Sequence, residues 1–439
     1  MDAAVSVSMT SGAVAERDDA HVWHPWSPVG PSSGLMIARA EGYRLWDVDG
    51  REYVDGASGA MNCSCGHGRA ELVAAVGDQL RTLAHVDLSF GAHEPSGRLA
   101  ERLAGLLGHG LTRTFFANSG SEGIEAACRI ALNHWSNRGE PRHRIVSFER
   151  GYHGSTALCQ SLSGLPAALP DLPSAVPVAR VALTDEPRAL TDPAACDRLL
   201  GAWERALDEP GAGEVAAVVV EPLLNAGGGV VFHPSFLAGL RRLCDERGVL
   251  LVVDEVFTGF GRTGEMFGFR HSGITPDVVV MSKGITSGYV PLSAVTTTDE
   301  VYRGFASDPV YGGLRYGHTT SGHAAACAVA LATLDVIERD ELVANARDRG
   351  AELLRGLGGL AGHAGVVDVR GLGLTVVVEC SSAGTAARLR EEIGRHGVLL
   401  RQQMSSLLAV PPLVIDAAGV RELTSRVLGA FAVAGGHAG

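Results

Sequence analysis

The sequence predicts an α/β protein built on a mostly parallel sheet. Short apolar runs rich in β-branched residues alternate with segments of helical spacing along 439 residues, and this alternation favours parallel strands covered on both faces. Two runs, residues 249–264 and 278–284, begin as buried strands and then reach Asp254 and Lys283. Ligands bind beyond the carboxyl ends of strands in open α/β sheets. We therefore expect this carboxylate and this amine to meet in one crevice, although a structural ion pair would give the same pattern.

Composition restricts the class of protein. The chain has 46% hydrophobic residues, 20% charged residues and a net charge of −12, which is ordinary for a globular protein and argues against a nucleic-acid surface. No apolar run approaches the ~20 residues of a membrane span. Eight cysteines are too few for a disulfide scaffold and suit a reducing compartment. We expect a cytoplasmic protein without nucleic-acid or membrane partners.

A short group of possible metal ligands lies near the N-terminus. Cys63, Cys65 and His67 are close in sequence, but no second ligand pair follows at the spacing of a zinc site. We therefore expect no metal.

The N-terminal part of the chain is expected to contain a tail, a ribbon and two helices. Residues 1–20 lack the basic start and the long apolar core of a signal peptide, so we interpret them as a mobile tail. Residues 43–56 show the pattern of a hairpin that turns at Asp49-Gly50. Residues 71–83 and 94–107 carry apolar side chains at helical spacing.

A possible anion site follows where a strand turns into a helix. The pattern predicts a strand at 112–117, a turn at 118–121 and a helix at 122–135. The N–H groups of Gly120 and Ser121 would then point out of a helix N-terminus, which favours an anion such as phosphate. An ordinary Ser or Asn N-cap is the alternative interpretation.

The middle of the chain repeats the pattern of a buried strand followed by polar residues. Residues 144–148 form a strand that places Tyr152 and His153 beyond its end, and residues 215–220 form one that stops at Glu221. Between them, residues 162–210 show weak periodicity, so we expect them to run over the surface. Helices are expected at 234–247 and 324–339.

The C-terminal hundred residues have the pattern of a smaller α+β unit. We therefore expect a large domain at residues 76–330 and a small domain formed by residues 21–75 and 331–439. Strands are expected at 366–380, 398–403 and 407–410, and helices at 383–396 and 417–431.

Two motifs suggest other classes of protein. Residues 259–264, GFGRTG, have the glycine pattern of a dinucleotide-binding loop and would indicate a nicotinamide-dependent oxidoreductase. No helix opens there, however, and the next strand does not end in the acid that would hold a ribose hydroxyl. Residues 250–255 resemble the magnesium-binding strand of an NTPase, but the chain has no G-x-x-x-x-G-K-[ST] loop. Both remain remote alternatives.

The order of the motifs carries a family resemblance. NSGSE, GYHG, VVEP, VVDEVFTGFGRTG, SKG, VPL and GHTTSGH occur in the order and spacing of class III aminotransferases, and the likeness extends from HVWHPW to VPPLVI. The chain therefore resembles this family, and its omega-aminotransferase branch in particular. The resemblance implies a pyridoxal 5'-phosphate enzyme of fold type I.

The resemblance also implies a role for each matching residue around the cofactor ring. Lys283 would form the Schiff base, and Asp254 would contact the pyridine nitrogen, which a buried carboxylate keeps protonated. Val256 and Tyr152 would cover opposite faces of the ring. A desolvated lysine loses its proton readily, so Lys283 could also carry the proton during transfer, a contribution of ~10²–10⁴-fold. Glu255 is expected to point away from Asp254, into packing or a solvated ion pair.

Other matching residues concern the phosphate and the substrate. Gly120 and Ser121 would bind the phosphate, helped by Thr319 of the partner subunit in a homodimer with active sites at the interface. Arg401 falls where the family often carries an arginine for the substrate carboxylate, a natural role for a bidentate donor; an exposed arginine on a strand edge is the alternative. Trp26 and Met61 lie in segments expected to touch the substrate.

Departures from the family pattern bear on the substrate. Diaminopelargonate synthases carry a tyrosine and a Trp-Trp pair where this chain has Trp26 and Ala60-Met61. Ornithine and 4-aminobutyrate types carry a glutamate at the position of Ala226. Neither substrate class is therefore implied.

We predict an aminotransferase that moves an amino group from an amine or amino acid to a keto acid or aldehyde by a ping-pong mechanism. A racemase or epimerase on the same scaffold is the main alternative, because both reactions begin with loss of a proton from the amino carbon. A cofactor-binding regulator without activity is a further alternative, against which the intact Lys283 and Asp254 argue.

Overall fold

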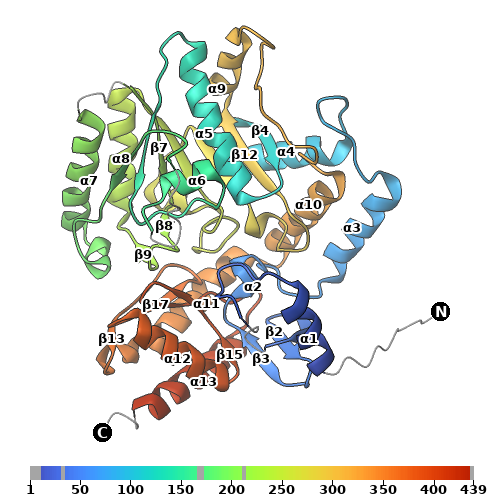
Figure 1. Cartoon of the computed structure of the whole chain (residues 1–439), viewed down its shortest axis with the longest axis vertical. Coiled ribbons are helices and arrows are strands. Elements are labelled where there is room, and N and C mark those ends of the chain that lie inside the picture. Colours follow the sequence, from blue (N-terminus) through green and yellow to red (C-terminus); the bar gives the residue numbers. More distant parts are fainter. Residues whose placement is uncertain (1–10, 31–34, 166–172, 210–213, 436–439) are drawn as a thin grey trace.

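The computed structural model describes residues 11–30, 35–165, 173–209 and 214–435 of the chain. These residues form two parts, one above the other in Figure 1. The upper part, which we call the large domain, is a seven-stranded sheet with its covering helices. The lower part, the small domain, contains two four-stranded sheets and three long helices.

The sheet of the large domain confirms the predicted mostly parallel α/β architecture. Its strand order is β4-β12-β11-β10-β7-β5-β6. The pairs from β11 to β6 are parallel, whereas β12 runs antiparallel to both of its neighbours. The strands are β4 Leu111–Ala117, β5 Arg144–Phe148, β6 Val178–Val181, β7 Val215–Val220, β10 Leu250–Asp254, β11 Val278–Met281 and β12 Ser293–Thr298.

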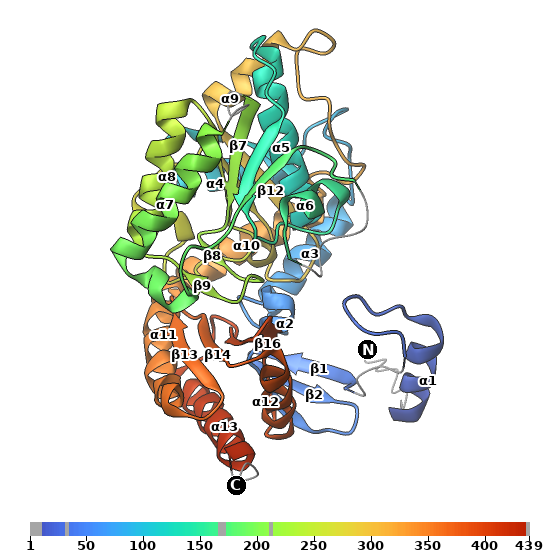
Figure 2. The same ribbon diagram turned by 60° about the vertical axis from the view of Figure 1, so that its left-hand side comes forward.

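Helices cover both faces of this sheet, as Figure 2 shows with α7 and α8 on one side and α5 and α6 on the other. Successive side chains of a strand point to opposite faces. In β10, Val252 belongs to the apolar cluster that includes the buried side chains of α5, and Val253 belongs to the cluster that includes those of α8. The helices are α3 Ala70–Thr82, α4 Glu94–Leu107, α5 Gly120–Asn137, α6 Ala157–Leu162, α8 Pro234–Arg247, α9 Asp299–Gly304 and α10 Ala324–Arg339.

The expected surface course of residues 162–210 is wrong for much of its length. Residues 166–172 lie outside the described residues, but the rest contains β6 and a helix of 16 residues, α7 Pro193–Asp208. Asp192 caps α7 by accepting the N–H of Ala194 at 2.8 Å, a standard N-terminal signal. Trp203 of this helix is fully buried. The sequence of α7 does carry apolar residues at helical spacing, but the alanines, prolines and acids around them obscure this pattern.

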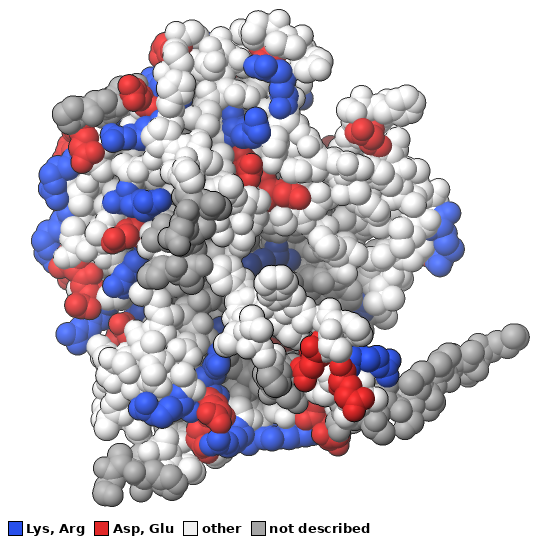
Figure 3. Space-filling view, in the orientation of Figure 1, with Lys and Arg blue, Asp and Glu red and all other residues white. Residues whose placement is uncertain are grey.

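Ion pairs join α7 to α8. Arg247 of α8 lies 2.7 Å from Asp208 and 3.3 Å from Glu204 of α7. Figure 3 shows basic and acidic side chains interspersed at this edge of the molecule. Such exposed pairs contribute little individually, so the packing of the buried faces holds the two helices together.

The small domain combines both ends of the chain. The first sheet has the order β1-β2-β3-β15 and the second β13-β14-β17-β16. The predicted ribbon is confirmed as β2 and β3, and β15 lies parallel to β3. The elements are β1 Ile37–Glu41, β2 Arg44–Asp47, β3 Glu52–Asp55, α2 Ser58–Met61, α11 Leu342–Gly358, β13 Val366–Gly371, β14 Val376–Cys380, α12 Ala383–Arg395, β15 Val398–Leu399, β16 Arg401–Gln403, β17 Ser406–Ala409 and α13 Ala417–Gly435.

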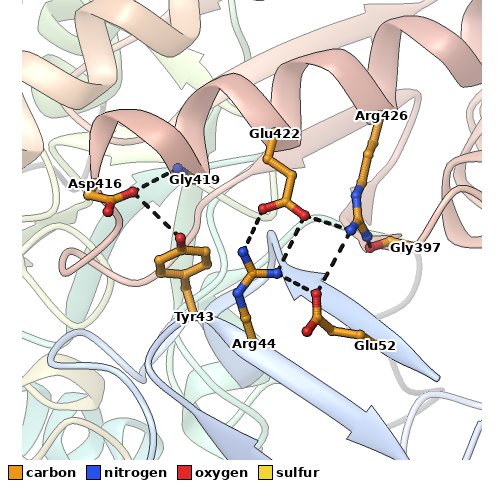
Figure 4. Close-up of polar contacts among 8 residues, drawn as sticks. All are labelled: Tyr43, Arg44, Glu52, Gly397, Asp416, Gly419, Glu422 and Arg426. Atoms are coloured by element: carbon orange, nitrogen blue, oxygen red, sulfur yellow. Dashed lines mark hydrogen bonds and ion pairs between the residues drawn. The ribbon is translucent and has the colours of Figure 1, made fainter. Parts of the chain in front are cut away.

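A polar network fastens the N-terminal strands to the C-terminal helix, as Figure 4 shows. Arg44 of β2 pairs with Glu422 of α13 at 2.7 Å and also with Glu52 of β3. Arg426, one turn further along α13, pairs with Glu422 at 2.6 Å and donates to the carbonyl of Gly397 at 3.0 Å. Because these charges share partners, they hold two segments that lie almost 400 residues apart in the chain.

Two buried arginines cross the boundary between the domains. Arg262 of the large domain donates from Nη1 to the carbonyls of Leu374 and Pro411, at 2.9 and 2.8 Å. Arg370 of the small domain donates to the carbonyls of Gly228 and Gly229, both at 2.8 Å. Burial lowers the pKa of Arg262 to about 10, so the side chain still carries its charge at neutral pH.

The first described residues form a helix, α1 Ser11–His21. The expected tail at residues 1–20 is therefore helical in its second half, and its first ten residues lie outside the described residues. Within the described part of the chain, no helix combines the length and the apolar character that a membrane span requires.

Candidate active site

Four parallel strands bring their carboxyl ends to one edge of the large sheet. These are β5, β7, β10 and β11. Asp254 is the last residue of β10, and Tyr152, Glu221 and Lys283 come shortly after the ends of β5, β7 and β11. The pairing of β10 with β11 sets Asp254 opposite Val280, three residues before Lys283. The sheet thus brings the predicted carboxylate and the predicted amine to the same edge.

Asp254 is fixed by two hydrogen bonds in a buried position. It is only 4% exposed; its Oδ2 lies 2.8 Å from Nδ1 of His153, and its Oδ1 accepts the N–H of Val256 at 3.0 Å. Burial alone would lower the pKa of His153, but the bond to Asp254 and the charges of Asp254 and Glu221 outweigh it and raise that pKa. His153 therefore holds the carboxylate in place by donating a hydrogen bond from Nδ1.

Glu221 adds a third buried group that the sequence analysis left without a role. Its carboxylate accepts the N–H groups of Tyr152 and Asn225, at 3.1 and 3.2 Å. Burial raises the pKa of Glu221 to about 7 against the lowering effect of His153. The available signal was an acid directly after a buried strand, the same signal that identified Asp254.

Lys283 is half-buried and sits in an unusual backbone conformation. Its φ of +43° is in the left-handed region, where a residue other than glycine costs of the order of 1 kcal/mol or more. Its Nζ has no hydrogen-bond partner in the described residues and lies 5.5 Å from the ring centroid of Phe257. Burial lowers the pKa of Lys283, although Asp254 and Glu221 oppose this. The amine is thus available as a nucleophile or base.

The residues of the predicted anion site lie at the start of α5. The Ser119 hydroxyl caps this helix by accepting the N–H of Glu122 at 3.2 Å, so the N-cap interpretation is correct for Ser119. The N–H groups of Gly120 and Ser121 find no acceptor in the described residues and stay available to a ligand. The N-cap is therefore present, while the anion site stays a prediction that these free N–H groups are compatible with.

Glycines let two neighbouring segments approach this helix end closely. A Cβ on Gly120 would lie 3.0 Å from Cγ1 of Val256. Gly154 has a φ of +127°, and a Cβ there would overlap the Ser121 side chain. The hydroxyl of Ser121 accepts the N–H of Ser155 at 3.0 Å. The structure thus brings the predicted residues Gly120, Ser121 and Val256 together.

The two predicted aromatic residues lie against each other. The ring of Trp26 is 6.1 Å from that of Tyr152 in an edge-to-face arrangement. Trp26 is 63% exposed, with a φ of +58°, and the Tyr152 hydroxyl bonds to the Ser155 hydroxyl at 2.9 Å. This pair borders the same edge of the sheet.

Other predicted residues lie around this edge in different environments. Met61 is buried in an apolar cluster with Phe257 and Val377, across the boundary between the domains. Arg401, on the outer strand β16, is exposed and has no partner in the described residues, yet its charge helps to lower the pKa of Lys283. Thr319 is exposed, and its carbonyl accepts a bond from His85 at 2.8 Å.

Glu255 packs in the interior. It is fully buried and accepts the Thr258 hydroxyl at 2.6 Å and the N–H groups of Gly268 and Phe269 at 2.9 and 2.8 Å. Burial raises the pKa of Glu255 to about 7. Of the two expectations, packing is correct and a solvated ion pair is wrong.

Comparisons with known proteins identify relatives of this chain. A family model described as "Aminotransferase class-III" matches residues 28–431. Adenosylmethionine-8-amino-7-oxononanoate aminotransferase of Geobacter sulfurreducens is 35% identical over 428 residues, which cover 91% of this chain and 93% of that protein. A thermostable (S)-enantioselective omega-transaminase from Thermomicrobium roseum superposes with a TM-score of 0.91 at 34% identity, covering 97% and 99% of the two chains. An amine transaminase from an uncultivated Pseudomonas species, solved in its PLP-bound form, gives 0.89 at 33% identity, covering 94% and 98%.

Proposed function

Because this chain belongs to the class III aminotransferase family, we propose that it transfers an amino group from an amine or amino acid to a keto acid or aldehyde in two half-reactions at one site. The observation that carries this proposal is the convergence of Lys283, Asp254 and the free N–H groups of α5 at one edge of the sheet. The family's cofactor is pyridoxal 5'-phosphate, and each of these groups suits one part of it.

The residues present fit that cofactor. The N–H groups of Gly120 and Ser121 would hold its phosphate at the start of α5. Val256, which packs against Gly120, and Tyr152 would cover the two faces of its ring. Asp254, oriented by His153, would face the pyridine nitrogen. When bound, the cofactor supplies an electron sink for the carbon that loses a proton.

Lys283 has two tasks in this proposal. Its Nζ would hold the cofactor before a donor arrives, and its lowered pKa would favour the unprotonated amine that this needs. With a donor bound, the same Nζ would take the proton from the donor's amino carbon and return it later as an acid. Proton transfer by a positioned group typically contributes ~10²–10⁴-fold.

Arg401 and Trp26 are the residues through which we propose that substrates are selected. Among the described residues the guanidinium of Arg401 has no partner, so it is free to pair with a substrate carboxylate. Trp26 covers Tyr152 from the outer side, where a substrate would approach. Met61 would act indirectly, because it lies in the same apolar cluster as Phe257, and the Phe257 ring lies 5.5 Å from Nζ of Lys283.

We further propose a homodimer in the cytoplasm, with Thr319 of the partner subunit completing the phosphate site. Large apolar side chains support an interface because they are strongly exposed in one chain: Trp23 and Phe90 are each 90% exposed, and Tyr311 is 79% exposed. All eight cysteines are free, which suits a reducing compartment.

A half-reaction experiment tests the function. The purified protein, loaded with pyridoxal 5'-phosphate, is mixed with a panel of amines and amino acids without acceptor, and the cofactor's absorbance is followed. We expect stoichiometric conversion of the cofactor to its amine form and one equivalent of carbonyl product with at least one donor. A racemised donor with unchanged absorbance would instead indicate an epimerase, and the absence of any change would refute the proposal.

A further inference from the structure

A serine to which no role has been assigned joins two parts of the proposed cofactor site. Ser155 lies in the loop between β5 and α6. Its hydroxyl bonds to the hydroxyl of Tyr152 at 2.9 Å, and its N–H donates to the hydroxyl oxygen of Ser121 at 3.0 Å. Ser155 is therefore bonded both to the residue proposed for one face of the cofactor ring and to a residue proposed for the phosphate.

The ring of Tyr152 has little packing to hold it. Its side chain is half-buried, and among the described residues its one contact with another ring is the edge-to-face contact with Trp26, at 6.1 Å between centroids. Trp26 is itself 63% exposed. A tyrosine in such surroundings can change its side-chain rotamer unless a partner holds its polar tip. In the described part of the chain, Ser155 is the partner of the Tyr152 hydroxyl.

The main chain of Tyr152 is fixed separately. Its N–H donates to Oε1 of Glu221 at 3.1 Å, and Glu221 is only 5% exposed. The next residue, His153, is buried and bonded to Asp254 at 2.8 Å. The backbone on both sides of the Tyr152 side chain is therefore held by buried groups. The remaining freedom lies in the side-chain torsions, and the hydroxyl of Ser155 is placed to restrict them.

Ser155 is exposed, so its own position depends on the contact with α5. Gly154 makes this contact possible: its φ is +127°, and a Cβ on it would lie 2.4 Å from the hydroxyl oxygen of Ser121. Without that Cβ the loop passes close to the helix, and the N–H of Ser155 reaches Ser121. Because the Ser121 oxygen accepts this N–H, its hydroxyl hydrogen stays available to donate to an anion.

We propose that Ser155 is a positioning residue of the cofactor site, whose hydroxyl holds the Tyr152 ring in the orientation that covers the cofactor ring. This inference rests on the proposed function. Ser155 acts through Tyr152 and does not itself touch the cofactor. Through its N–H it also keeps Tyr152 in a fixed place relative to Ser121. A side chain that is ordered before the ligand arrives spares the ligand the entropic cost of ordering it, so the tether should raise the affinity for the cofactor.

Replacing Ser155 with alanine removes the hydroxyl and keeps the N–H. The loss of one neutral hydrogen bond and of the order that it gives to one side chain should raise the dissociation constant of pyridoxal 5'-phosphate about three- to ten-fold. Ser155→Thr keeps a hydroxyl at an exposed position where a methyl group has room. It should restore the affinity to within about two-fold of the wild type.

A double-mutant cycle separates this role from a general effect on the loop. Tyr152→Phe removes the same hydrogen bond from its other end. In the Tyr152→Phe background, Ser155→Ala should therefore weaken cofactor binding no further, whereas the effects of two independent sites would multiply. Ser136→Ala is the matched control, because Ser136 is an exposed serine at the opposite end of α5. It should leave the affinity unchanged.

Two measurements on the full-length protein test the proposal, and neither depends on catalytic activity. Equilibrium dialysis with pyridoxal 5'-phosphate gives the dissociation constant of each variant. Circular dichroism in the cofactor's absorption band, measured at saturation, reports the orientation of the rings around the bound cofactor. We expect a smaller band in Ser155→Ala and in Tyr152→Phe, and a band of wild-type size in Ser155→Thr and Ser136→Ala.

Wild-type affinity and dichroism in Ser155→Ala would overturn the proposal, and so would effects that multiply in the double mutant or a Ser155→Thr variant that restores nothing. If Ser155→Ala does not fold, Tyr152→Phe decides the matter, because wild-type values in that variant would show that the hydroxyl pair has no part in binding. A wild-type chain that binds no pyridoxal 5'-phosphate would refute the proposed function, and this role with it. The two failures are distinct, since the former appears only in the variants.

Discussion

Replacing Arg401 with alanine should lower kcat/KM for substrates that carry a carboxylate by about ten- to hundred-fold. A hydrogen bond to a charged group contributes about 1.5–3 kcal/mol net, and about 1.4 kcal/mol corresponds to a factor of ten. Arg401 is exposed and has no protein partner in the described residues, so the substitution breaks no intramolecular bond. The loss should therefore fall on substrate binding and leave folding unaffected.

A second effect of the same substitution can be separated by choice of substrate. The charge of Arg401 helps to lower the pKa of Lys283, so its removal raises that pKa and slows every substrate alike. Arg401→Lys keeps the charge but not the planar fork that binds a carboxylate in two places. It should therefore restore the rate with simple amines and aldehydes, and only part of the rate with keto acids.

The assay is steady-state kinetics with paired substrates of similar size, one with and one without a carboxylate. Arg388→Ala is a suitable control, because Arg388 is another exposed arginine, on the helix α12 that packs against β16. Equal losses for charged and uncharged substrates in Arg401→Ala would refute the carboxylate role. The arginine would then act only through Lys283 or by supporting the antiparallel pairing of β16 with β17.

Three other changes test different parts of the site. Lys283→Ala should abolish amino transfer and should remove the borohydride-stable cofactor label that peptide mapping is expected to find on Lys283. Gly120→Ala places a Cβ 3.0 Å from Val256, an overpacking worth about 1–3 kcal/mol, so cofactor affinity measured by dialysis should fall about ten-fold or more; Gly105→Ala, where the space is open, should not change it. Folding raises the pKa of Glu255 from 4.5 to about 7, so the contribution of this group to stability is present below about pH 4.5 and is lost as the pH rises to about 7. The free energy of unfolding in urea should therefore decrease by at most about 3 kcal/mol between pH 5 and pH 8. The decrease should be smaller in Glu255→Gln.

Elements with a strong local pattern could be predicted from the sequence. α4 was expected at residues 94–107 and spans Glu94–Leu107, because its buried Leu99, Leu103 and Leu107 recur every fourth residue. Asp254 and Lys283 could be identified because each comes at or just after the end of a run of apolar β-branched residues. This pattern can be recognised without knowing which strands pair with each other.

Features that depend on distant partners could not be predicted in this way. β12 was missed because Ser293, Thr296 and Thr297 make it look polar, yet the Ser293 hydroxyl bonds to the carbonyl of Met281 at 2.9 Å inside the sheet. The bond between His153 and Asp254 joins residues 101 positions apart, and only the strand order brings them together. The apolar environment of Met61 likewise comes from segments of both domains.

The two arginines that cross the domain boundary have a consequence for how substrates reach Lys283. Arg262 and Arg370 each bind two main-chain carbonyls of the opposite domain, and a hinge rotation would leave a buried charge and these oxygens without partners, at a cost of several kcal/mol. The two domains should therefore travel as one rigid body through the catalytic cycle. Under the proposed function, adjustment to substrates of different size would then fall to individual exposed side chains, Trp26 and Arg401, whose rotamers can change within nanoseconds.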